Sequence, residues 1–200
     1  MKSKKILSFL CVVISVIFAF ETIFFDGKIV NAATSQSEST DKFVISTVED
    51  FETFAKNCSL DEWSKGKTIV LNNNLDLKKA QNIMVPYFGG VFEGNGYVIK
   101  NLVIKSKNSY CGMFSKTTED AIIRNLKVEA TIKPTGEPFD VGGIVGKNYG
   151  TVSKCEFRGV VEGYNYVGQI VGFNAKSGNI ANCQSSGKII GKYYSWRKRI

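Results

Sequence analysis

The feature that most constrains this chain is a segment of sequence that occurs twice in its C-terminal half. Residues 141–163 read VGGIVGKNYGTVSKCEFRGVVEG, and residues 167–191 read VGQIVGFNAKSGNIANCQSSGKIIG. The VGxIVGxN portion recurs after 26 residues, and a Cys-x3-Gly-x3-Gly portion recurs after 28 residues. Self-similarity at this period is typical of a solenoid, in which each repeat stacks on the previous one. Because solenoids act mainly through their outer surface, the pattern lowers the expectation of a buried active site.

A shorter element extends the repeat towards the N-terminus. It consists of an apolar residue, two spacers and then Leu or Cys, and its four copies end at Leu102, Leu126, Cys155 and Cys183. The residues that follow alternate between apolar and polar, as in LKVEATI at residues 126–132, which indicates a β-strand with one buried face. We expect Leu102, Leu126, Cys155 and Cys183 to occupy equivalent core positions.

Each unit also carries a second apolar segment beside a glycine. These segments are Val91–Phe92, Met113–Phe114, Ile144–Val145 before Gly146, and Ile170–Val171 before Gly172. Two or three short strands per unit, joined at glycines, can coil so that successive units stack about 4.8 Å apart. We therefore predict an all-β solenoid, a right-handed parallel β-helix of about four coils over residues 91–191.

The same residues resemble a known family. GIVG at residues 143–146 and QIVG at residues 169–172, each followed by Asn and an Ile/Val-x-x-Cys element, resemble the GLUG repeat of bacterial surface and secreted proteins. GMFS at residues 112–115 is similar to a diverged copy, and FEGNGYVIKNLVI at residues 92–104 resembles the coil that often precedes such repeats. The resemblance covers roughly half of the chain. It implies a passive module of a larger surface protein, some relatives being related to immunoglobulin A peptidases.

The N-terminus predicts export. Three lysines in the first five residues precede an apolar run over residues 6–20, and VNAA follows at residues 30–33. This arrangement is typical of a secretory signal peptide over residues 1–32 that is cleaved after Ala32. An uncleaved anchor is the alternative, but Glu21 and Asp26 leave the apolar run shorter than the roughly 20 residues of a membrane span. We expect a secreted or cell-surface location.

Between the signal peptide and the coils, the sequence predicts a linker and an N-terminal cap. Residues 33–42 are polar and lack apolar periodicity, as linkers do. Within the cap, residues 43–90, Ser46 and Glu49 have the spacing of a capping box, and an apolar stripe predicts a helix that ends near Cys58. Strands are expected at residues 68–71 and 75–77. Such a segment would shield the first coil from solvent.

The C-terminal tail, residues 192–200, is basic and aromatic. By register, another VGxIVG strand should follow Gly191, with Tyr194 matching Tyr166, but the sequence continues as SWRKRI. The tail is either a cap folded over the last coil or the point at which a longer array has been shortened. We favour the second interpretation because no helix or apolar cap pattern fits into nine residues.

The composition of the chain argues against an enzyme. The chain has no histidine, so zinc peptidases of the HExxH type and hydrolases with the usual triad are excluded. Glycosidases need two facing carboxylates, and the adjacent acidic pairs are Glu49–Asp50, Asp61–Glu62 and Glu119–Asp120. We interpret these pairs as solvated helix-start or turn residues. We predict no catalytic residue, no metal site and no cofactor.

Four cysteines follow the signal peptide, at positions 58, 111, 155 and 183. Equivalent positions on adjacent coils would bring Cys155 and Cys183 within the range of a disulfide. The alternative is a pair of buried free thiols, which we favour because Leu fills the same position in earlier coils. A metal site is less favoured because no C-x-x-C spacing is present.

Charge and aromatic residues suggest a ligand surface. Without residues 1–32, the chain keeps 22 basic and 16 acidic residues, a net charge of +6. The candidate surface comprises Tyr149, Tyr164, Tyr166, Tyr193, Tyr194, Trp196, Arg197, Lys198 and Arg199. For an exported protein, cell-wall polyanions or environmental glycans are the expected partners and nucleic acid is not. The membrane is expected to matter only during export, and a solvated surface without a ligand is the alternative.

Together these patterns predict a non-catalytic, exported structural or adhesive module that displays loops on a β-helix. The first alternative is a β-helix that binds or degrades polysaccharide. The second is a fragment of a larger surface protein without independent activity.

Overall fold

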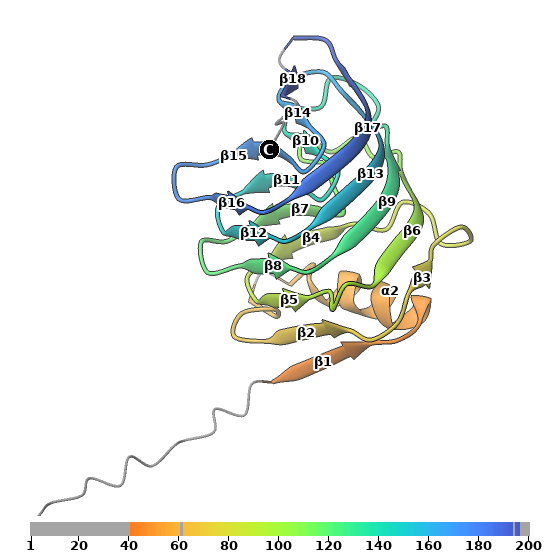
Figure 1. Cartoon of the computed structure of the whole chain (residues 1–200), viewed down its shortest axis with the longest axis vertical. Helices are drawn as coiled ribbons and strands as arrows, with labels where there is room; N and C mark the ends of the chain where they lie inside the picture. Colours follow the sequence, from red (N-terminus) through yellow and green to blue (C-terminus); the bar gives the residue numbers. More distant parts are fainter. Residues whose placement is uncertain (1–40, 61, 194, 197–200) are drawn as a thin grey trace, which may run out of the picture. The chain divides into compact units, whose positions relative to one another are not determined.

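The fold is a parallel β-solenoid of about five turns with one helix among the described residues (Figure 1). The computed structural model describes residues 41–60, 62–193 and 195–196. The predicted signal peptide, most of the linker, Tyr194, Arg197, Lys198 and Arg199 lie outside these residues. In the part of the chain that is described, no helix has the length and apolar character needed to cross a membrane.

Four parallel sheets run along the solenoid. Sheet 1 contains β1 (Lys42–Ile45), β2 (Thr68–Leu71), β5 (Val91–Glu93), β8 (Ile122–Arg124), β12 (Thr151–Ser153) and β16 (Asn179–Ala181). Sheet 2 contains β3 (Leu75–Asp76), β6 (Val98–Ile104), β9 (Lys127–Ile132), β13 (Glu156–Gly163) and β17 (Gln184–Gly191). Sheet 3 contains β4 (Val85–Phe88), β7 (Phe114–Thr117), β11 (Val145–Asn148) and β15 (Val171–Asn174). Sheet 4 contains β10 (Val141–Gly142), β14 (Val167–Gly168) and β18 (Ser195–Trp196).

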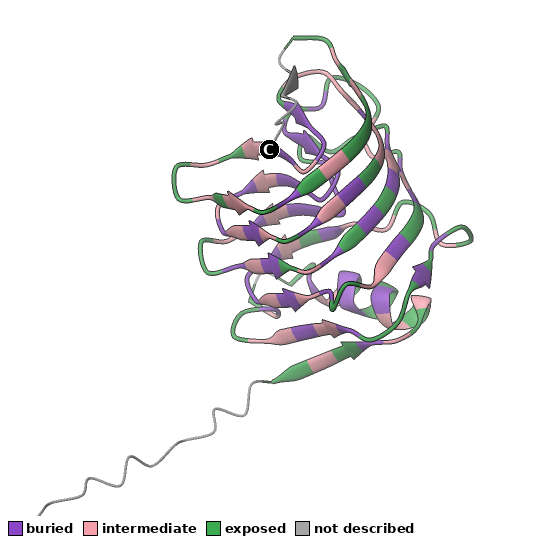
Figure 2. Cartoon of the chain, in the orientation of Figure 1, coloured by how far each residue is buried: buried purple, intermediate pink, exposed green. Residues whose placement is uncertain are grey.

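Side-chain alternation along these strands builds one continuous core. In β9, buried residues alternate with more exposed ones, and β13 buries Phe157 and Val161 on the same side; Figure 2 shows this striping along sheet 2. Because the strands are parallel and in register, like residues stack: Phe92, Ile123 and Val152 are paired neighbours in sheet 1, and all three are fully buried. The strand alternation predicted for residues 126–132 is confirmed.

The one helix, α2 (Val48–Asn57), packs its apolar side against the N-terminal turns. Phe51 and Phe54 are fully buried, and the Phe54 ring lies 5.7 Å from Phe92 and 5.9 Å from Phe88, centroid to centroid. The predicted helix end near Cys58 is confirmed, since Cys58 is the C-cap.

The predicted capping box at Ser46 and Glu49 is wrong by one residue. Thr47 is the N-cap: its hydroxyl accepts a hydrogen bond from the backbone N–H of Asp50, whose carboxylate accepts one from the backbone N–H of Thr47. The predicted pair, Ser46 and Glu49, and the observed pair, Thr47 and Asp50, both have the three-residue spacing of a capping box. Thr47 has the extended backbone of an N-cap, and a helix that starts at Val48 presents Phe51 and Phe54 to the core.

Two of the predicted repeat equivalences are also wrong. Leu102 pairs with Ala130 and not with Leu126, because the register of β6 against β9 shifts between Ile99 and Leu102. Likewise, Val91–Phe92 pairs with Ile122–Ile123 in sheet 1, whereas Val85 is the residue that precedes Phe114 and Val145 in sheet 3. The turn beyond the predicted four coils comes from β2, β3 and β4, which lie within the segment predicted as the N-terminal cap.

A polar ladder lies inside sheet 3. Asn148 is fully buried, its Oδ1 accepts a hydrogen bond from the Thr117 hydroxyl (2.8 Å), and its Nδ2 donates to Asn174 Oδ1 (2.7 Å). The same Nδ2 donates to the Gly150 carbonyl (3.0 Å). Buried amides are stabilising when their donors and acceptors are paired, as here. This ladder explains why Asn recurs after each VGxIVG segment.

Glycine is required where β13 and β17 stack on β9. Gly159 and Gly187 are register partners with φ values of +148° and +116°. A Cβ on Gly159 would lie 1.9 Å from the Ala130 carbonyl oxygen, so the strands would have to separate. The recurrence of glycine at this position therefore follows from close backbone packing.

Candidate functional site

The outer side of sheet 3 carries one column of aromatic and lysine residues. Tyr87, Lys116, Lys147 and Phe173 are successive register partners on β4, β7, β11 and β15. Neighbouring strand backbones in a sheet lie about 4.8 Å apart, so the four side chains form a short ladder across the strands. We call these four residues, with Tyr149, the aromatic–lysine face.

Each lysine of this face lies over aromatic rings. The Lys116 ammonium is 5.6 Å from the Tyr87 ring centroid and 5.5 Å from that of Tyr149. The Lys147 ammonium is 5.8 Å from Tyr149 and 5.2 Å from Phe173. Cation–π contacts of this kind restrict the lysine side chains, so their charges are held in place before any ligand arrives.

The electrostatics of the face are governed by Lys147 and the buried Asp140. Their closest ion-pair distance, Lys147 Nζ to Asp140 Oδ2, is 3.9 Å, and Asp140 is 5% exposed. Burial raises the pKa of Asp140, and the Lys147 charge opposes that change. Burial acts to lower the pKa of Lys147, but Tyr110, Tyr149 and Asp140 raise it overall. Lys147 therefore stays charged near neutral pH.

The predicted ligand surface divides between different places in the structure. Tyr149 belongs to the aromatic–lysine face, and the Tyr166 ring packs edge-on against Phe173 at 5.6 Å. Tyr164 and Tyr193 form a separate pair, with ring centroids 4.9 Å apart and the Lys192 ammonium 4.7 Å from the Tyr164 ring. For Trp196 the structure describes the backbone of β18 alone.

The sequence prediction missed four members of the face: Tyr87, Lys116, Lys147 and Phe173. A signal for three of them was present, because Lys116, Lys147 and Phe173 each follow the apolar-apolar-small element, in MFSK, IVGK and IVGF. Tyr87 follows the same two apolar positions in MVPY, but with Pro in place of the small residue, and its place in the column is given by strand pairing.

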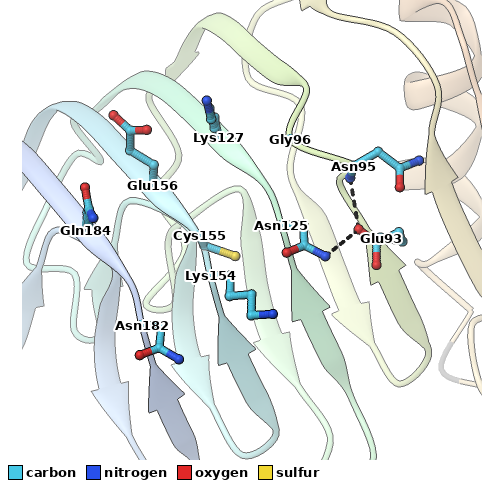
Figure 3. Close-up of a pocket in the computed structure, with 10 residues that line it drawn as sticks. All are labelled: Glu93, Asn95, Gly96, Asn125, Lys127, Lys154, Cys155, Glu156, Asn182 and Gln184. Atoms are coloured by element: carbon cyan, nitrogen blue, oxygen red, sulfur yellow. Dashed lines mark hydrogen bonds between the residues drawn. The ribbon is translucent and has the colours of Figure 1, made fainter.

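A second candidate site is a groove of about 600 Å³ where sheets 1 and 2 meet (Figure 3). We call it the corner groove. Its polar lining comes from the turns that follow β5, β8, β12 and β16, and from the starts of the sheet 2 strands. The polar side chains that line the groove include Glu93, Asn125, Lys127, Lys154, Asn182 and Gln184.

Glu93 lies at one end of the corner groove and accepts three hydrogen bonds. Its Oε1 accepts from the Asn95 backbone N–H (3.0 Å) and from Asn125 Nδ2 (2.8 Å), both drawn in Figure 3. Its Oε2 accepts from Arg124 Nε (2.7 Å). Burial acts to raise the pKa of Glu93, but Asn125, Asn95 and Arg124 together lower it. A carboxyl group held ionised in this way is a poor general acid.

In the described part of the chain, none of the acidic pairs weighed from the sequence lines the corner groove, whereas Glu119 lines a pocket together with Tyr149 of the aromatic–lysine face. Glu49 is in the first turn of α2, and Glu119 and Asp120 are exposed in the turn between β7 and β8. Glu62 is exposed, whereas Asp61 lies outside the described residues. Among the described residues, no group of three or more His, Cys, Asp or Glu side chains could hold a metal ion.

The four described cysteines are buried free thiols. Cys155 and Cys183 follow register partners at the ends of β12 and β16, and the Sγ of each donates a hydrogen bond to a backbone carbonyl. Burial raises the pKa of Cys58 to about 12 and that of Cys111 to about 11. These thiols are therefore poor nucleophiles in the folded protein.

Comparison with curated proteins finds similarity to halomucin of Haloquadratum walsbyi, at 34% identity over 88 residues. The matched stretch covers 42% of this chain, and the chain spans about 1% of the length of this relative. No family model matches the chain, so the GLUG resemblance stays a prediction. No solved structure matches it.

Proposed function

We propose that the protein is a non-catalytic, exported surface module that adheres to acidic glycans through its aromatic–lysine face. The observation that carries this proposal is the register column on sheet 3, in which two adjacent lysines lie between two aromatic rings and contact them. Sugar rings stack on aromatic faces, and carboxylates pair with ammonium groups. A linear acidic polysaccharide offers both features along one chain.

The solenoid supports this function mechanically. Its parallel strands fix the spacing of the face, so a repeating ligand meets a repeating surface. We propose that the coils are right-handed and that α2 is an N-terminal cap, because Phe51 and Phe54 fill the core beside the first turns. A cap of this kind keeps a solenoid end from pairing with other chains.

Export is proposed from the sequence of residues 1–32, with cleavage after Ala32. N-terminal sequencing of the protein recovered outside an expressing cell tests this part. A first residue of Ala33 supports the proposal, and an intact Met1 contradicts it.

Binding is favoured over degradation because the carboxylate best placed in a groove, Glu93, is held ionised by three donors. Incubation with polygalacturonate, read for new reducing ends and unsaturated products, tests this choice. The proposal expects neither product. Appearance of either one would identify an enzyme.

The binding test compares immobilised polygalacturonate with its fully methyl-esterified form, which keeps the sugar rings and loses the charges. We expect the protein to be retained on the acid form and to pass through the ester. Lys147→Gln and Tyr149→Ala should each weaken retention about tenfold, which corresponds to roughly 1.4 kcal/mol of lost contact.

The matched control is Lys188→Gln, which removes an exposed lysine on β17, far from the face in the sequence and on another sheet. It should bind as the unaltered protein does. Equal weakening by Lys147→Gln and Lys188→Gln would show general charge attraction and would contradict a defined face. Retention on polyphosphate as strong as on polygalacturonate would contradict a sugar ligand.

A further inference from the structure

We propose that the corner groove is a second binding site, which takes a single acidic sugar residue and uses Lys154 as its main anchor. The proposal does not rest on the aromatic–lysine face, because the two surfaces lie on different sheets.

Lys154 occupies a left-handed turn position that neighbouring turns fill with asparagine. Its φ is +52°, and its counterparts one turn before and one turn after are Asn125 (φ +54°) and Asn182 (φ +54°). Asn tolerates this conformation much better than residues such as Lys do. The chain therefore keeps a residue that is unfavourable for the backbone at one point of an otherwise regular ladder, as functional sites often do.

Lys154 and its neighbours also have unused hydrogen-bonding capacity. Within the described residues, the ammonium groups of Lys127 and Lys154 make no ion pair or hydrogen bond, and the side-chain amides of Asn182 and Gln184 make none either. Figure 3 shows these four side chains around one groove, from β9, β17 and the turns after β12 and β16. Two cations and two amides thus remain available to a ligand.

The acidic residues that line the groove are already neutralised. Glu93 is paired with Arg124 (2.7 Å), and Glu156 is paired with Arg158 (3.1 Å). Lys127 and Lys154 therefore supply an unbalanced positive charge, and an anion entering the groove meets little repulsion.

The volume and donor set indicate the class of ligand. A groove of about 600 Å³ is in the size range of small-molecule sites. Ammonium groups suit a carboxylate, and amides suit hydroxyl groups, which both donate and accept. A uronate, a sugar ring with one carboxylate, presents these groups together, either free or as the end of a polysaccharide.

Calorimetric titration of the purified protein with galacturonate and with digalacturonate tests the site. Lys154→Asn copies the neighbouring turns, so we expect it to weaken binding about tenfold while the melting temperature stays equal or rises. Lys154→Arg should retain binding. Lys79→Asn, an exposed lysine outside the groove, is the charge-matched control and should bind normally.

Each result has a defined meaning. Unchanged binding by Lys154→Asn, or a clear drop in its melting temperature, would overturn the proposal. Binding of inorganic phosphate as tight as that of galacturonate would reduce the site to a general anion patch and also overturn it. Tighter binding of digalacturonate than of galacturonate would point to a polysaccharide end as the source, and equal binding would point to the free sugar acid. Lys147→Gln should leave these titrations unchanged, so failure here is distinct from failure of the aromatic–lysine face.

Discussion

Replacement of Phe54 by Ala tests how α2 joins the solenoid. The Phe54 side chain is fully buried, and its ring centroid lies within 6.5 Å of six other aromatic rings, those of Phe43, Phe51, Trp63, Phe88, Phe92 and Phe114. Removal of a buried Phe ring costs about 3–5 kcal/mol, and the cost is higher where neighbours cannot collapse into the space. Four of these neighbours, Phe43, Phe88, Phe92 and Phe114, are fixed in paired strands, so we expect about 4–5 kcal/mol.

For a domain of this size, each kcal/mol lowers the melting temperature by roughly 2–4 °C, so the expected decrease is about 8–20 °C. Far-UV circular dichroism during heating measures it. Phe139→Ala is the control, since that ring is 44% exposed, and a change of less than about 2 °C is expected. If Phe54→Ala had the same melting temperature as Phe139→Ala, α2 would not be part of the folded core, and the proposed cap would be refuted.

Three further predictions address the coils. Gly159→Ala should lower the free energy of unfolding by several kcal/mol, because its Cβ would lie 1.9 Å from the Ala130 oxygen. A urea midpoint close to that of the unaltered protein would contradict the stacking of β13 on β9. Asn148→Ala should cost about 2–3 kcal/mol in thermal unfolding, since it leaves the buried partners of Asn148 unsatisfied, and a cost near zero would argue against the ladder. The pKa of Glu93 is lowered in the fold, so its carboxylate stabilises the protein above the ordinary pKa, and this contribution is lost as pH falls through the lowered value. The melting temperature of Glu93→Gln should therefore be below that of the unaltered protein at neutral pH and equal to it in acid. A difference that grows in acid would contradict the lowered pKa of Glu93.

The fold class could be predicted from the sequence because the repeated residues are those that fill the core. Residues 126–132 alternate strictly, and the VGxIVGxN segments recur where β10, β11, β14 and β15 stack. The register of the earlier coils was not predictable in the same way. Leu102 fits the apolar-x-x-Leu motif, but a shift in strand pairing places it beside Ala130, and no local pattern reports such a shift.

The candidate sites were harder to predict for a related reason. Tyr87 and Phe173 are far apart in the sequence and come together through the pairing of four strands. Lys154 precedes Cys155 in the repeated apolar-x-x-Leu/Cys element as Asn125 precedes Leu126 and Asn182 precedes Cys183, so the Lys in place of Asn could be read from the sequence. The left-handed backbone that makes it notable could not. Tyr149 was found from the sequence because it lies within the duplicated segment.

The most direct test of the central claim is the salt dependence of polygalacturonate binding by the unaltered protein, Lys116→Gln, Lys147→Gln and the double variant. Binding to a linear polyanion releases about one counterion for each cation that engages it, so the plot of log K against log salt concentration becomes shallower as cations are removed. We expect the slope to fall by about one unit for each lysine replaced and by about two for both. Slopes that stay unchanged in all three variants would contradict the claim that this column of side chains is the binding face.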